Sequence, residues 1–168
     1  MTSRKGFFLQ QEACDSDPQT SDGIFVYLGE QGDWVEAGDR VRVTGTVQEY
    51  YGLTEIVSSP SQVMVLGSEY ALPEPVGFAP PLERSAGNDY LESLEGMRLR
   101  LDSAVVVGPT DSNDRTWVVG IDTGFERLFL DETTCLALCV DDGGIAEIEP
   151  EAQVGDTIQG LRGSLDFS

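Results

Sequence analysis

A strand pattern interrupted by one glycine constrains the fold of this chain more than any other feature. Between Gly38 and Val47, valines alternate with arginines and threonines, and this period of two is typical of a half-buried β-strand. Gly45 stands inside the pattern, which predicts a bulge or a sharp bend of the kind that small β-barrels need where a strand turns a corner. A similar Gly-Asp opening with glycines inside a strand pattern recurs at residues 154–165, which indicates a second, related β unit.

The rest of the composition favours short strands and tight turns. The 168 residues are 40% hydrophobic, enough for a packed core, and include 19 glycines and 8 prolines. A short helix is predicted from Tyr90 to Leu94, with Asn88 or Asp89 as its N-terminal cap. Four prolines between residues 72 and 81 predict an extended linker. We therefore predict an all-β protein with one β unit at residues 1–70, a linker at 71–88 and a second β unit at 89–168.

Charge and residue content exclude several functions. The net charge of −20, from 30 acidic and 10 basic residues, argues against binding nucleic acid through bulk electrostatics. It fits a secreted or salt-adapted protein, or one that recruits divalent cations. The chain has no histidine, so Ser-His and Cys-His catalysis are absent. No apolar run approaches the ~20 residues of a membrane-spanning helix. We expect no catalysis by this chain alone.

Several stretches resemble the OB-fold-like domain of bacterial extracellular nucleases. They are residues 6–10 (GFFLQ), 20–27 (TSDGIFVY) and 38–54 (GDRVRVTGTVQEYYGLT). Residues 91–97 (LESLEGM) resemble the segment that follows in that family, and residues 155–168 resemble the segment before its catalytic domain. The resemblance implies an OB-like barrel followed by a second, incomplete OB-like unit, an extracellular or cell-surface location, and a parent protein that is a metal-dependent endonuclease.

The same resemblance implies that the first barrel is incomplete. The family has a valine-rich strand before the GFFLQ stretch, whereas five residues precede Gly6 here. An incomplete barrel exposes a strand edge, which would bind a strand from a partner or from the adjacent nuclease domain.

Aromatic and cationic side chains in the first unit are candidates for binding single-stranded nucleic acid. Tyr50 and Tyr51 end a predicted strand, and OB folds stack bases on such rings with arginines nearby. Arg40 and Arg42 alternate with the predicted core valines and should therefore face outward. The alternative is that the aromatic residues only pack in the core and turns.

Acidic and cysteine-containing segments supply further candidates. Asp15, Asp17 and Asp22 share a polar loop whose oxygens could hold Ca²⁺ or Mg²⁺; alternatively, they only form turns. Cys135 and Cys139 are four residues apart and are candidates for a disulfide, although a third cysteine could pair with either.

Two functional hypotheses remain open from the sequence. The first is a non-catalytic accessory module of a secreted nuclease, which positions nucleic acid or the adjacent catalytic domain. The second is an acidic, calcium-stabilised structural module that acts in surface assembly or strand exchange.

Overall fold

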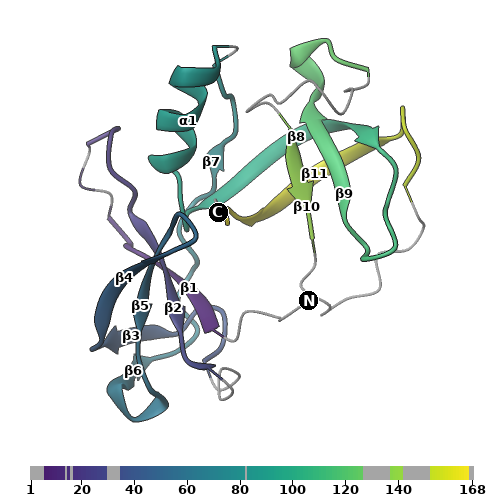
Figure 1. Ribbon diagram of the computed structural model, residues 1–168. Coiled ribbons are helices and arrows are strands. Elements are labelled where there is room, and N and C mark those ends of the chain that lie inside the picture. The colour runs from purple at the N-terminus through teal and green to yellow at the C-terminus, as the bar shows by residue number, and fades with distance from the viewer. Residues whose placement is uncertain are drawn as a thin grey trace. The chain divides into compact units, whose positions relative to one another are not determined.

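The computed structural model describes residues 6–13, 15, 17–29, 35–81, 83–126, 137–141 and 152–166. Figure 1 shows that this part of the chain is mostly β-strand with one short helix and a curled, half-barrel sheet, which confirms the predicted all-β, barrel-like fold. The chain forms two compact units. The first unit contains residues 1–76, 92–98 and 164–168, and the second contains residues 77–91 and 99–163.

A four-stranded sheet forms the larger part of the first unit. Its strands, in spatial order, are β1 (Gly6–Gln10), β2 (Gly23–Tyr27), β5 (Leu53–Val57) and β4 (Thr46–Tyr50). The pairing of β2 with β5 is parallel, and the other two pairings are antiparallel. β1 and β4 therefore form the two ends of this sheet.

A second, two-stranded sheet completes the β structure of the first unit. β3 (Arg40–Val43) pairs antiparallel with β6 (Val63–Gly67), which follows the 3-10 helix η2 (Pro60–Gln62). The predicted bend lies between β3 and β4. A Cβ atom at Gly45 would lie 2.4 Å from the carbonyl oxygen of Val57, so only glycine allows this close approach of the backbones.

The core of the first unit uses the alternation seen in the sequence. Val26, Leu28 and Val63 are buried, and half-buried apolar side chains pack against them. Those side chains are Phe7, Leu9, Val35, Val41 and Val43. Arg40 and Arg42 alternate with Val41 and Val43 along β3 and are exposed, as the period of two predicts.

The second unit is built on a further sheet. Its order is β10 (Leu138–Val140), β9 (Thr116–Gly120), β8 (Arg98–Gly108) and β11 (Thr157–Ser164), and β7 (Val76–Gly77) also pairs with β8. The 3-10 helix η3 (Ile121–Thr123) follows β9. Ala104, Val106 and Val118 are fully buried in this sheet.

The one described α-helix, α1 (Arg84–Glu92), begins and ends earlier than predicted. Its first turn is closed by a hydrogen bond from the Gly87 amide to the Glu83 carbonyl, so Asn88 and Asp89 lie within the helix and do not cap it. The polar residues that resemble caps are exposed on the surface of α1. The prediction from cap residues placed the start of the helix too late, because the turn before Asn88 also forms helical hydrogen bonds.

Candidate functional site

The β4–β5 hairpin presents two aromatic rings on a strained turn. Tyr51 and Gly52 connect the strands, and both have positive φ (52° and 91°), as a type I′ turn requires. This conformation is uncommon for a bulky side chain such as tyrosine and costs free energy. Backbone strain of this kind is concentrated at functional sites, so the hairpin is a candidate functional site.

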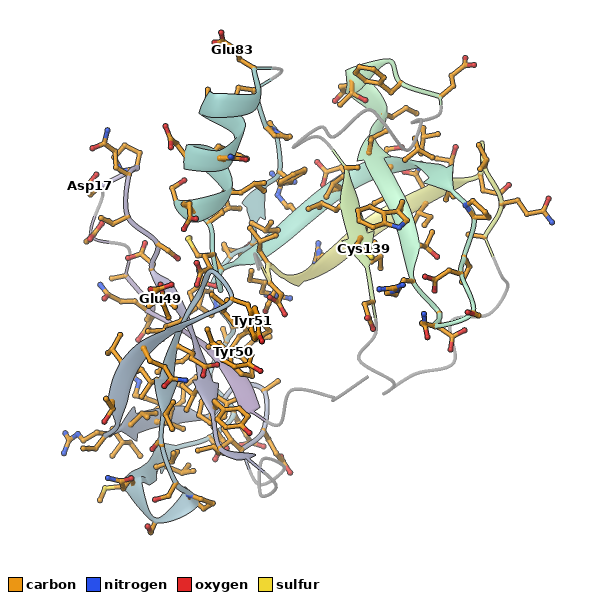
Figure 2. The ribbon with its side chains drawn as sticks, viewed as in Figure 1. Asp17, Glu49, Tyr50, Tyr51, Glu83 and Cys139 are labelled. Carbon is orange, nitrogen blue, oxygen red and sulfur yellow. The ribbon has the colours of Figure 1, made fainter. Side chains whose placement is uncertain are left out.

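The rings of Tyr50 and Tyr51 are in contact and open to solvent. Their centroids are 4.7 Å apart and their planes make an angle of 87°, an edge-to-face arrangement. Tyr50 is 48% exposed and Tyr51 is 83% exposed. Figure 2 shows both side chains together near Glu49. Their exposure does not fit packing in the core, whereas the alternative that they pack in the turn stays open.

Carboxylates surround the base of this hairpin. The Thr54 hydroxyl donates to Glu49 Oε1 at 2.6 Å, and the Thr54 amide donates to Glu95 Oε1 at 2.6 Å. Burial raises the pKa of Glu95 to about 7, although the Thr54 hydrogen bond lowers it, and Glu92, Glu49 and Asp166 raise it further. The surroundings of Glu95 therefore disfavour its ionised form.

Glu95 was not predicted as a site residue. Its side chain is buried, with 6% of the residue exposed. The sequence contains one faint sign of this, an acidic residue between the apolar residues Leu94 and Met97. That pattern does not identify the contact with Thr54, which lies 41 residues away in the chain.

The two candidate arginines belong to the other sheet of the first unit. Arg40 forms an ion pair with Glu12, and its guanidinium carbon lies 4.3 Å from the centroid of the Tyr70 ring. Arg42 is exposed on β3 opposite Met64. Among the described residues, no ion pair or hydrogen bond joins either arginine to Tyr50 or Tyr51. Arg42 is the better candidate for contacting a ligand, because Arg40 is already engaged.

The candidate metal loop is organised by its own hydrogen bonds. Asp15 Oδ1 accepts from the Asp17 amide at 2.8 Å, and Asp22 Oδ1 accepts from the Asp15 amide at 3.2 Å. Asp17 Oδ1 likewise accepts from the Gln19 amide at 3.0 Å. The bonds accepted by Asp15 and Asp17 are those of Asx turns, and the bond accepted by Asp22 joins the two ends of the loop. Within the described residues no group of three or more acidic or cysteine side chains is arranged to hold a metal ion, so cation binding here stays a prediction.

Asp17 also lies away from the tyrosine pair, as Figure 2 shows. The loop and the hairpin are therefore two separate candidate sites within the first unit.

The predicted disulfide involves one residue that the structure describes. Cys139 lies on β10 opposite Trp117, and its thiol is free with respect to the described part of the chain. Partial desolvation raises the pKa of this thiol, which lowers its thiolate fraction near neutral pH. Cys135 lies outside the described residues, so the pairing stays a prediction.

The comparisons with known proteins identify a family whose function is unknown. No curated protein and no solved structure matches the chain. None of the helices in the described ranges is long and apolar enough to cross a membrane. One family model, described as a domain of unknown function (DUF8508), matches residues 81–168. The matched residues include α1 and β8 to β11, whereas the β4–β5 hairpin precedes them. Because the match spans just over half of the sequence, the chain belongs to the DUF8508 family.

Proposed function

We propose that this chain is a non-catalytic, OB-like accessory module of a larger extracellular nuclease, and that it positions single-stranded nucleic acid near the adjacent catalytic domain. The observation that carries the proposal is the Tyr50–Tyr51 pair on the strained β4–β5 turn. Every base has an aromatic face, so exposed tyrosines bind single strands without needing a particular sequence. An energetically costly turn that exposes both rings fits a selected binding role better than a structural one.

The charge of the chain sets the conditions under which this binding occurs. At a net charge of −20, the protein repels a phosphate backbone at low ionic strength. Glu49 lies next to the tyrosines in the sequence and is exposed. Divalent cations such as Mg²⁺ or Ca²⁺ would lower this repulsion by bridging carboxylates and phosphates. We therefore expect stacking on the tyrosines to depend on a divalent cation.

Fluorescence anisotropy of a labelled single-stranded oligonucleotide tests the proposal. The full chain should bind at low salt with Mg²⁺ or Ca²⁺. Added NaCl should lower the affinity, because Na⁺ competes for the carboxylates and phosphates that the divalent cation bridges. The double variant Tyr50→Ala/Tyr51→Ala should bind at least about tenfold more weakly, because stacking contributes roughly 1–3 kcal/mol per base.

Trp117→Ala is the matched control for that double variant. Trp117 is 45% exposed on β9 of the second unit and is not one of the candidate binding residues, so its removal should leave binding unchanged. Circular dichroism would check that each variant is folded. If the wild-type chain does not bind with or without the cation, the nucleic-acid role is wrong.

A second candidate function, assembly by strand addition, is favoured by the exposed edge of the four-stranded sheet. β4 ends the sheet, all five of its residues are exposed, and Val47 is 63% exposed. Edge strands of this kind accept a further strand through main-chain hydrogen bonds. The two candidates use neighbouring parts of one hairpin, but they predict different partners.

Sedimentation of the chain, alone and with candidate partners, tests the second function. Val47→Lys places a charge on the edge and should abolish association through β4. Met64→Lys is the control, since Met64 is 58% exposed on β6 of the other sheet. Association that survives Val47→Lys and is lost in Met64→Lys would assign the contact to β6 and contradict a role for β4.

A further inference from the structure

A buried acidic side chain lies at the point where three distant segments of the first unit meet. Residues 92–98 connect α1 to β8 and belong to the first unit. The Gly96 amide donates to the Leu165 carbonyl at 2.8 Å, and the Leu165 amide donates to the Met97 carbonyl at 2.9 Å. The Ser21 hydroxyl donates to the Glu95 carbonyl oxygen. This segment is therefore attached both to the C-terminal segment and to the start of β2.

The Glu95 side chain connects residues 92–98 to β5. Its Oε1 atom accepts a hydrogen bond from the Thr54 amide at 2.6 Å. Thr54 is also tied to β4, because its hydroxyl donates to Glu49 Oε1 at 2.6 Å. One carboxyl group thus connects the segment 92–98 to the hairpin, and it does so with 6% of the residue exposed to solvent.

Within the described part of the chain, the charges that act on this carboxyl group are negative. They come from Glu92 in the same stretch of chain, Glu49 on β4 and Asp166 in the C-terminal segment. The nearest basic residue along the chain is Arg98, and its guanidinium donates to the Pro73 carbonyl at 3.1 Å. An ionised Glu95 would therefore be a buried charge among like charges, compensated by a backbone amide.

We propose that protonation of Glu95 controls a local contact: the neutral form keeps residues 92–98 in contact with β5, and the ionised form favours local opening of that contact. Ionisation of Glu95 is unfavourable in free energy only while the side chain is buried. Local opening exposes the carboxyl group to water and removes this penalty. This response to pH changes the stability of the first unit and does not depend on what the β4–β5 hairpin binds.

The direction of the pH dependence follows from the pKa. Burial raises the pKa of Glu95 from its ordinary value of 4.5 to about 7 in the folded chain. The folded state therefore holds this proton more tightly than the open state. The contribution of Glu95 to stability is fully present below the ordinary value, and it is lost as the pH rises through about 7.

The first test is the pH dependence of unfolding in the wild type and in Glu95→Gln. Glutamine keeps an oxygen acceptor for the Thr54 amide but cannot ionise. Between about pH 5 and pH 8, the folding equilibrium constant of the wild type should fall relative to that of Glu95→Gln by roughly fifty-fold, or less if water reaches the site. Glu74→Gln is the control: it removes the same charge from an exposed position of the first unit and should keep the wild-type pH slope.

A second measurement keeps the proposal testable if Glu95→Gln does not fold. In the wild-type chain, the Thr54 amide resonance should shift with a midpoint near pH 7, and its hydrogen exchange should show lower protection above that pH after correction for base catalysis. Equal pH slopes in the wild type and Glu95→Gln would overturn the proposal. A Thr54 amide that titrates with a midpoint near the ordinary glutamate pKa would also overturn it.

Discussion

Tyr51 occupies a backbone conformation that asparagine or glycine adopts at lower cost. Its φ of 52° precedes a glycine, and Asn-Gly is the preferred pair in type I′ turns. Tyr51→Asn should therefore stabilise the chain by about 1 kcal/mol in urea unfolding, because it relieves strain. The same substitution should weaken oligonucleotide binding, since it removes the more exposed of the two rings.

Tyr50→Asn is the matched comparison for this prediction. Tyr50 lies in regular β4 opposite Leu53, so asparagine there should give no gain in stability. If Tyr51→Asn proved neutral or destabilising, the turn would not be strained, and its backbone conformation would not support a functional role for Tyr51. The trade of stability for exposed aromatic surface is what a functional residue is expected to show.

Residue-level prediction from the sequence worked where the information is local. The alternation of Val41 and Val43 with Arg40 and Arg42 gave the correct faces of β3, and Gly45 gave the bend. The burial of Glu95 could not be predicted in this way. Its partners Thr54 and Ser21 lie 41 and 74 residues away, so its environment is created by the tertiary fold.

At the scale of elements, the segment between α1 and β8 depends on a close approach of two backbones. Gly96 has a φ of 71°, and a Cβ atom there would lie 2.7 Å from the Ile24 amide nitrogen at the start of β2. Gly96→Ala should therefore be destabilising in two ways, through the unfavourable φ and through the clash with β2. Loosening this contact should also raise hydrogen exchange at Thr54, which Glu95 holds.

Gly29→Ala separates those two effects. Gly29 is in the same unit with a similar φ of 66°, but a Cβ atom there would meet nothing within 4 Å. Gly29→Ala should cost about 1 kcal/mol in chemical unfolding, and Gly96→Ala should cost at least roughly twice as much. Equal losses for the two variants would mean that β2 moves freely away from the segment and that the packing is not tight.

Sequence patterns identified strands but could not assign them to neighbours. The strand predicted to end at Tyr50 and Tyr51 forms as β4, which pairs with β5. The parallel pairing of β2 with β5 joins residues about thirty apart, and no turn between them indicates it. Apolar alternation identifies a strand and its buried face, whereas the choice of partner depends on the whole core.

At the scale of the whole molecule, compact units are not continuous stretches of sequence. Residues 92–98 and 164–168 belong with the first 76 residues, although a Pro-rich stretch separates them along the chain. Composition locates prolines and turns, but it does not report the hydrogen bonds between Gly96, Met97 and Leu165. Such long-range contacts arise only when the fold brings the segments together.

The net charge of −20 makes the stability of the whole chain depend on ionic strength. Self-repulsion destabilises the compact state, and salt screens it within a Debye length of about 10 Å at 0.1 M. We expect Tm in differential scanning calorimetry to rise by a few degrees as NaCl is increased to about 0.2 M. KCl should give the same curve, because screening depends on ionic strength. A Tm that is constant or falls would show that the acidic residues are far enough apart for repulsion to be negligible.

Divalent cations extend this experiment to the loop of Asp15, Asp17 and Asp22. CaCl₂ or MgCl₂ should raise Tm further than NaCl at equal ionic strength only if the folded chain holds the cation, since binding to the folded state adds its own stabilisation. Asp15→Asn/Asp17→Asn should remove that excess if this loop is the site. The control Glu74→Gln/Glu36→Gln removes the same charge from exposed positions in the same unit. It should leave the extra rise in Tm with CaCl₂ or MgCl₂ unchanged. An excess that survives in the loop variant would assign the cation to other acidic residues, and identical curves for all salts would leave screening as the whole effect.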